Sequence, residues 1–122
     1  MLTMSSLLLS SVSVLANDVS ENMDILAQNY NAVLTAKDAS ALKKSLAAMR
    51  AAAEDSKKGV PPKLEKASPD SEVMKDYRHG YDILMAQIDD AMKLASEGKI
   101  DEAKAAAEKF KATRNEYHKK YR

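Results

Sequence analysis

The stretch YRHGYDILMAQIDDAMKLA, residues 77–95, decides the fold. Six of its residues recur at alternating spacings of four and three, so these six fall on one face of an α-helix. Gly98 follows three residues later, where a glycine commonly ends a helix. The stretch therefore predicts a long amphipathic helix that buries one stripe against neighbouring helices. The stripe consists of Tyr77, Tyr81, Leu84, Ile88, Ala91 and Ala95.

Three further stretches repeat this alternating spacing, and each predicts another helix packed at a shallow angle. The first series is Val19, Met23, Leu26, Tyr30 and Val33. The second is Leu42, Leu46, Met49 and Ala53. The last is Ile100, Ala103, Ala107, Phe110, then position 114, Tyr117 and Tyr121.

Capping residues and connections agree with four helices. Asp38 can cap the second helix, and Ser68 or Ser71 the third, with Pro69 suited to its first turn. The links before the second and fourth helices are short, which makes the joined helices antiparallel neighbours. The middle connection, KKGVPPKLEKASPDS at 57–71, carries all three prolines and is expected to be a loop. We therefore predict an all-α, antiparallel up-down-up-down four-helix bundle.

Composition limits the function. The 122 residues suffice for one domain with a real core. The net charge of +1 provides no general field for nucleic acid or acidic lipid, so we expect neither as a partner. Cysteine is absent, which excludes disulfides, Cys-ligated zinc, iron–sulfur clusters and thioether-linked haem.

The N-terminal segment MLTMSSLLLSSVSVLA, residues 1–16, is uncharged and contains a short apolar, Ser-rich run. It is too short to span a membrane and fits the later part of a secretory signal peptide, with cleavage after Ala16. The Lys or Arg expected near the start of a signal is missing, which suggests a truncated N-terminus or a misassigned start. A retained N-terminal helix is the alternative. We expect a mature domain of residues 17–122 in a bacterial periplasm.

Position 114 breaks the inward stripe of the last helix because it is Arg114. Burying a guanidinium is costly unless an anion meets it, although an Arg near a helix end can also extend to solvent. In the predicted topology, Met23 lies about 7 Å and His118 roughly 6 Å from the same end of the bundle, at ~1.5 Å per residue. Methionine on a stripe is commonly core filler. A thioether and an imidazole at matched depth, near tyrosines and an Arg, also suit the axial ligands, walls and propionate of a haem.

Taken together, three stretches resemble the cytochrome b562 family: MRAAAEDSKKGVPPKLEKASPD at 49–70, MKDYRHGYDIL at 74–84 and TRNEYHKKYR at 113–122. The resemblance runs from about Asn17 to Arg122. It implies one noncovalent haem b per chain, with Met23 and His118 as axial ligands and Arg114 near the haem. The family's haem-packing positions fall on Leu26, Pro61, Pro62, Tyr77, Tyr81, Tyr117 and Arg122. The aromatic residues at 77 and 81 are usually Phe in the family, so the extra hydroxyls here need partners or water.

If both ligands bind, the iron has no open coordination site, and one-electron transfer is the expected role rather than catalysis. We expect a monomer that exchanges electrons with redox proteins of unknown identity. Lys119, Lys120 and Arg122 could steer an acidic redox partner, or only complement the helix dipole. His79 falls off the stripe and is expected to be exposed, with adventitious metal binding as the alternative. A haem-free binding bundle and a haem carrier remain the rival functions.

Overall fold

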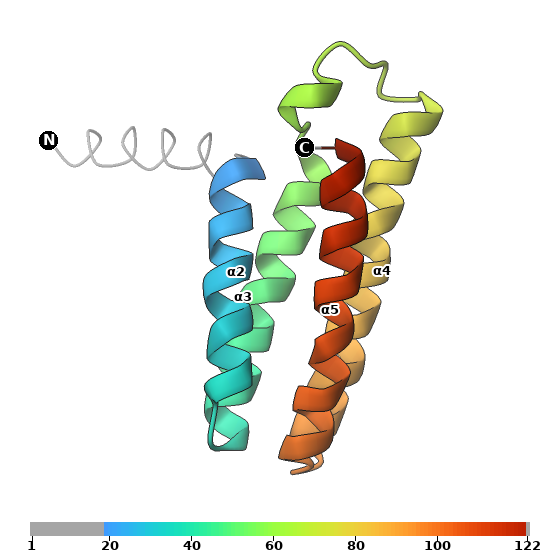
Figure 1. Cartoon of the computed structure of the whole chain (residues 1–122). Coiled ribbons are helices and arrows are strands. Elements are labelled where there is room, and N and C mark those ends of the chain that lie inside the picture. Colours follow the sequence, from blue (N-terminus) through green and yellow to red (C-terminus); the bar gives the residue numbers. More distant parts are fainter. Residues whose placement is uncertain (1–18, 122) are drawn as a thin grey trace, which may run out of the picture.

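The computed structural model describes residues 19–121 (Figure 1). They form four α-helices: α2 (Val19–Thr35), α3 (Ala39–Lys58), α4 (Glu72–Ser96) and α5 (Ile100–Tyr121). Successive helices run in opposite directions, as Figure 1 shows, and no strand occurs within the described range. The prediction of an antiparallel four-helix bundle is confirmed. The signal peptide predicted at residues 1–16 lies outside the described range.

The predicted apolar stripes form the core. Fifteen side chains from the four series are buried: Leu26, Val33, Leu42, Leu46, Met49, Ala53, Tyr77, Tyr81, Leu84, Ile88, Ala91, Ala95, Ala103, Ala107 and Phe110. Met23, Tyr30, Ile100 and Tyr121 pack against this core and are partly buried. Alternating spacing therefore identified the inward face of every helix, since burial of that face stabilises each helix far more than intrinsic propensity does.

Local capping explains where the helices begin and end. The Asp38 carboxylate accepts a 2.8 Å hydrogen bond from the Ala41 backbone N–H and caps α3. Ser71, not Ser68, caps α4, because its hydroxyl accepts a bond from the Met74 N–H. The predicted place of Pro69 in the first turn of α4 is wrong, since α4 begins at Glu72 and Pro69 lies in the preceding turn. Gly98 has a φ of 78°, which allows the chain to turn sharply from α4 into α5.

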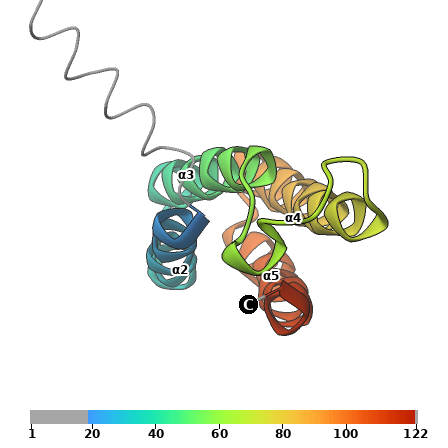
Figure 2. The same cartoon turned by 90° about the horizontal axis from the view of Figure 1, so that it is seen from above.

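The connection between α3 and α4 is a loop that contains a short 3₁₀-helix, η1 (Pro62–Leu64). The loop begins slightly later than the predicted residue 57, because α3 continues through Lys58. Arg78 on α4 donates a 2.9 Å hydrogen bond to the carbonyl oxygen of Pro69, which fixes the end of the loop. Seen from above, the loop crosses the end of the bundle (Figure 2).

The helices pack unequally around the bundle. Each helix packs closely against the next one in sequence, whereas α2 and α5 touch each other at only a few places. Figure 2 shows α2 and α5 apart, with α3 and α4 linking them on the other side. Ion pairs reinforce the α3–α4 contact: Arg50 Nε lies 2.7 Å from Asp89 Oδ1, and Lys57 Nζ lies 2.6 Å from Asp82 Oδ1. The bundle is thus closed on three sides and least tightly closed between its first and last described helices.

The described helices also bear on membrane association. Among residues 19–121, no helix combines the length and the apolar character that a bilayer span requires.

Candidate functional site

A cavity of about 390 Å³ lies at the end of the bundle where α2 begins and α5 ends. Its volume is within the range of small-molecule and cofactor sites. The walls come from α2, α4, α5 and the loop between α3 and α4, and no α3 residue contributes. The lining residues are Met23, Asp24, Leu26, Pro61, Lys63, Tyr77, Gly80, Tyr81, Leu84, Thr113, Arg114, Tyr117, His118 and Tyr121.

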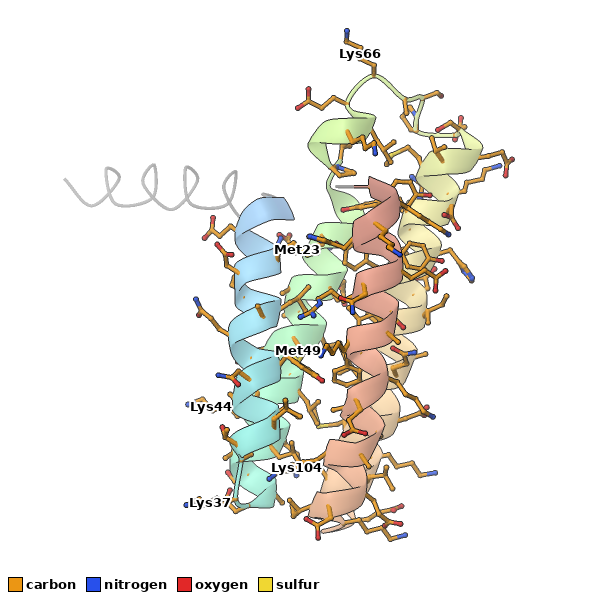
Figure 3. All side chains as sticks on the ribbon, viewed as in Figure 1. Met23, Lys37, Lys44, Met49, Lys66 and Lys104 are labelled. Carbon is orange, nitrogen blue, oxygen red and sulfur yellow. The ribbon has the colours of Figure 1, made fainter. Side chains whose placement is uncertain are left out.

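Two possible metal ligands line this cavity from different helices. Met23 is the fifth residue of α2 and is partly buried, whereas His118 lies in the last turn of α5 and is exposed. At ~1.5 Å per residue, Met23 lies about 6 Å from the start of α2 and His118 about 5 Å from the end of α5. Figure 3 places Met23 in the upper part of α2, at the end of the bundle that carries the C-terminus in Figure 1.

The residues present fit a haem. Thioether sulfur and imidazole nitrogen are both established axial donors to haem iron. Within residues 19–121, the imidazole of His118 makes no hydrogen bond or ion pair, so its nitrogens are available for coordination. The two donors stand on α2 and α5, which pack together less closely than any two helices consecutive in the sequence, and the cavity between them leaves space for a flat ligand.

Arg114 lines the cavity, but it does not occupy the inward, buried position of α5 that the stripe predicted for it. Thr113 takes that position, with only 9% of its surface exposed, and its hydroxyl donates a 3.0 Å hydrogen bond to Gln87 Oε1. Arg114 is half-buried, and its guanidinium donates only to the neutral Asn115 side chain, at 3.2 and 3.4 Å. The cavity therefore has a cation without a carboxylate partner, suited to an anionic group of a ligand.

Four tyrosines form a continuous aromatic wall. The rings of Tyr77 and Tyr81 on α4 meet edge to face with centroids 5.1 Å apart, and Tyr77 meets Tyr121 of α5 at 5.9 Å. Tyr117 and Tyr121 stack at 6.2 Å. The Tyr77 hydroxyl donates a 2.8 Å hydrogen bond to the backbone carbonyl oxygen of Ser56 on α3. Burial raises the pKa of Tyr77 and of Tyr81 above the ordinary value, so both hydroxyls stay protonated at neutral pH.

The last turn of α5 is tied to α4 through Asp76. The Tyr121 hydroxyl donates a hydrogen bond to the Asp76 carboxylate, and Lys120 Nζ lies 3.2 Å from the same carboxylate. The Tyr121 hydrogen bond is the largest cause of a lowered pKa at Asp76. Burial, with Asp76 nearby, raises the pKa of Tyr121 to about 12. Lys120 also lies 4.6 Å from the centre of the Tyr117 ring. Lys120 is thus engaged within the protein rather than available as a free surface cation.

Eight of the ten residues predicted for the site line the cavity: Met23, Leu26, Pro61, Tyr77, Tyr81, Arg114, Tyr117 and His118. Pro62 belongs to η1, but its side chain is outside the described set, as is the whole of Arg122. His79 is exposed, as predicted.

The sequence prediction missed some lining residues. Leu84 and Tyr121 stand on the predicted apolar stripes, so their positions around the helix could have assigned them to the cavity lining. Asp24 and Lys63 carried no such signal, because one is an exposed neighbour of Met23 and the other lies in a loop. Gly80 could be found only once the distance between α4 and α5 was known.

Fold and site together define a four-helix bundle with a cofactor-sized cavity at one end. The chain belongs to the cytochrome b562 family, whose model matches residues 18–122. Membership in this family implies haem binding.

Relatives support the same assignment. The chain is 50% identical over 117 residues to "Probable soluble cytochrome b562 2" of Yersinia pestis, an alignment that covers 96% of this chain and 91% of the relative. "Probable soluble cytochrome b562 1" of the same organism is 42% identical with the same coverage. An uncharacterized protein of Pasteurella multocida is 36% identical over 87 residues, 71% of this chain and 67% of that protein.

Proposed function

We propose that this protein is a periplasmic electron carrier that holds one noncovalent haem b between Met23 and His118. The observation that carries the proposal is that these two side chains, far apart in sequence, line one cavity from α2 and α5. When bound, haem supplies a one-electron iron redox couple. The absence of cysteine from the chain makes attachment noncovalent.

The two ligands also decide the class of reaction. Met23 and His118 would together hold the haem iron, and an iron held by two protein side chains would have no place for dioxygen or a substrate. A thioether is a soft donor that favours the reduced metal, so Met23 raises the reduction potential relative to a harder donor. The protein therefore passes electrons and does not catalyse substrate oxidation.

The remaining lining residues bind and shield the cofactor. Leu26, Leu84 and the tyrosine wall provide apolar surface that excludes water from the ring faces. Arg114 and Lys63 are cations at the cavity, and each can neutralise a propionate. The exposed cation Lys119 beside His118 can attract an acidic redox partner. A monomer is sufficient for this role, and the signal-like residues 1–16 support export to the periplasm.

Haem carriage is the second candidate, favoured by the exposure of His118. An exposed ligand on the loosely packed side of the bundle could release haem to an acceptor. Haem transfer to excess apomyoglobin, followed by absorbance, distinguishes the two. Electron carriage predicts retention through repeated reduction and oxidation, whereas rapid loss in either state would support carriage.

Substitution of Met23 tests the proposed ligation. Met23→Ala should leave five-coordinate iron and lower the reduction potential. Met85→Ala is the matched control, because Met85 is partly buried on α4 but does not line the cavity. An unchanged low-spin spectrum in Met23→Ala would show that another residue provides the ligand.

A histidine pair tests the other ligand. His118→Ala should lose most haem affinity, whereas His79→Ala, at an exposed position outside the cavity, should keep it. Full haem occupancy in purified His118→Ala would contradict the assignment.

A further inference from the structure

His118 stands on a segment of α5 that is supported mainly from one side. The few contacts between α2 and α5 give the end of α5 little support from α2. Within residues 19–121, the hydrogen bonds, ion pairs and ring contacts that join residues 117–121 to another helix all lead to α4. The direction of the imidazole must therefore depend on how α4 holds the last turn of α5.

The first contact is between Gly80 and the ring of Tyr117. A Cβ atom at position 80 would lie 2.6 Å from Tyr117 Cδ1 and 2.7 Å from both Cγ and Cε1. These distances are far below van der Waals contact, so the Tyr117 ring occupies space that only glycine leaves free. Tyr117 precedes His118 directly, and successive helix residues differ by about 100° around the axis. Any rotation of the end of α5 about its own axis that moves the Tyr117 ring away from α4 therefore also turns His118.

The second contact is Asp76, one helical turn before Gly80. Its carboxylate accepts from the Tyr121 hydroxyl and pairs with Lys120 at 3.2 Å. Tyr117 and Tyr121 are likewise one turn apart on α5, so two successive turns of α4 meet two successive turns of α5. His118 lies between these two contacts in the sequence.

We propose that Asp76 and Gly80 are positioning residues, and that together they hold the last turn of α5 so that His118 faces the cavity. This inference rests on the proposed role of His118 as a haem ligand. We call the pair the α4 clamp. Asp76 does not line the cavity, and Gly80, which does, acts here through its contact with Tyr117.

Gly80→Ala tests the steric half of the clamp. A helix-interior Gly→Ala change normally stabilises a helix. Here the methyl group should displace Tyr117, raise the amide hydrogen exchange of residues 117–121, and speed haem loss to excess apomyoglobin by about tenfold or more. In a Tyr117→Leu background, where the displaced ring is gone, the same Gly80→Ala change should alter haem loss less than about twofold.

Asp76→Asn tests the polar half, with Asp82→Asn as its matched control. Both carboxylates lie on α4 and pair with a lysine, but Asp82 pairs with Lys57 of α3 and not with α5. Asp76→Asn should speed hydrogen exchange in the last turn of α5 and haem loss by about tenfold, as expected when a charged hydrogen-bond acceptor is removed. Asp82→Asn should leave both rates close to those of the wild type.

The two measurements separate the clamp from the proposed function. Hydrogen exchange of residues 117–121 that is unchanged in Gly80→Ala and Asp76→Asn overturns the clamp. Faster exchange with unchanged haem loss overturns its role in positioning His118. If the wild-type chain binds no haemin, the proposed function fails and the positioning role fails with it, while hydrogen exchange still decides whether the two residues hold α5.

Discussion

The hydroxyl of Tyr77 on α4 donates a 2.8 Å hydrogen bond to the backbone carbonyl oxygen of Ser56 on α3. A wall of the cavity is therefore fastened to the one helix that does not line it. The same carbonyl also accepts a 3.1 Å bond from the N–H of Gly59, which ends α3. The tyrosine at this position thus gains a partner inside the protein, and its hydroxyl does not require water from the cavity.

Removal of this hydroxyl should affect stability more than haem binding. Tyr77→Phe should lower the free energy of unfolding by about 1 kcal/mol, because the carbonyl of Ser56 keeps its bond from Gly59. Urea unfolding measures this loss, and haemin titration should show little change. Tyr30→Phe is the control, since Tyr30 is partly buried and its hydroxyl makes no hydrogen bond within the described residues. Equal stability of the two variants would contradict the account.

Stability should fall in alkali because of the buried tyrosines. Burial raises the pKa of Tyr77 and Tyr81 above the ordinary value of 10.0, so the unfolded chain releases these protons first. Their contribution is complete below that value and is lost as the pH rises towards the folded pKa. The free energy of unfolding should therefore drop above about pH 10, by about 1.4 kcal/mol per pH unit for each tyrosine.

The double variant Tyr77→Phe/Tyr81→Phe isolates this effect from lysine titration. Its urea-unfolding free energy should depend less steeply on pH than that of the wild type in the same alkaline range. Parallel profiles for the two proteins would show that these hydroxyls do not cause the alkaline loss.

Loss of a helix cap far from the cavity should lower the stability of the bundle without changing its affinity for haem. Asp38 caps α3 at the turn between α2 and α3, at the opposite end of the bundle from the C-terminus (Figure 1). Asp38→Ala should cost about 1 kcal/mol in urea unfolding. Haem affinity should stay as in the wild type, and the exposed neighbour Lys37→Ala should alter neither quantity. A loss of haem affinity in Asp38→Ala would mean that the two ends of the bundle are coupled.

Removal of the cation at position 114 should weaken haem binding without unfolding α5. Arg114 lines the cavity and has no carboxylate partner, so Arg114→Gln removes a charge that the ligand would otherwise meet. We expect about tenfold weaker haemin binding with unchanged helix content by circular dichroism. Lys109→Gln removes the same charge from an exposed position of α5. A more stable apoprotein with unaltered haemin affinity would instead show that Arg114 only strains the bundle.

Sequence alone predicted those parts of the molecule that depend on periodicity and topology. Alternating spacing identified the core, and short connections placed Met23 and His118 at the same end of the bundle. The close approach of Gly80 to Tyr117 could not be predicted, because it depends on how near α4 and α5 come to each other. The inward position of Thr113 in place of Arg114 was also missed, since a helix of 3.6 residues per turn lets its buried face drift between neighbouring positions.

The ion pair of Lys120 is a third feature that the sequence did not predict. A basic C-terminus suggests free cations for a partner, whereas Asp76, 44 residues earlier in the sequence, pairs with Lys120 across the α4–α5 interface. Such a long-range ion pair leaves no local pattern. Of the cations suggested for partner attraction, only Lys119 is described as exposed and unpaired.

The absorbance spectrum of the purified full chain with equimolar haemin, recorded oxidised and then reduced, tests the central claim most directly. Coordination by Met23 and His118 predicts a low-spin spectrum in both states and a reversible change between them without loss of haem. A chain that stays colourless, and leaves the spectrum of free haemin unchanged when haemin is added, would contradict the assignment.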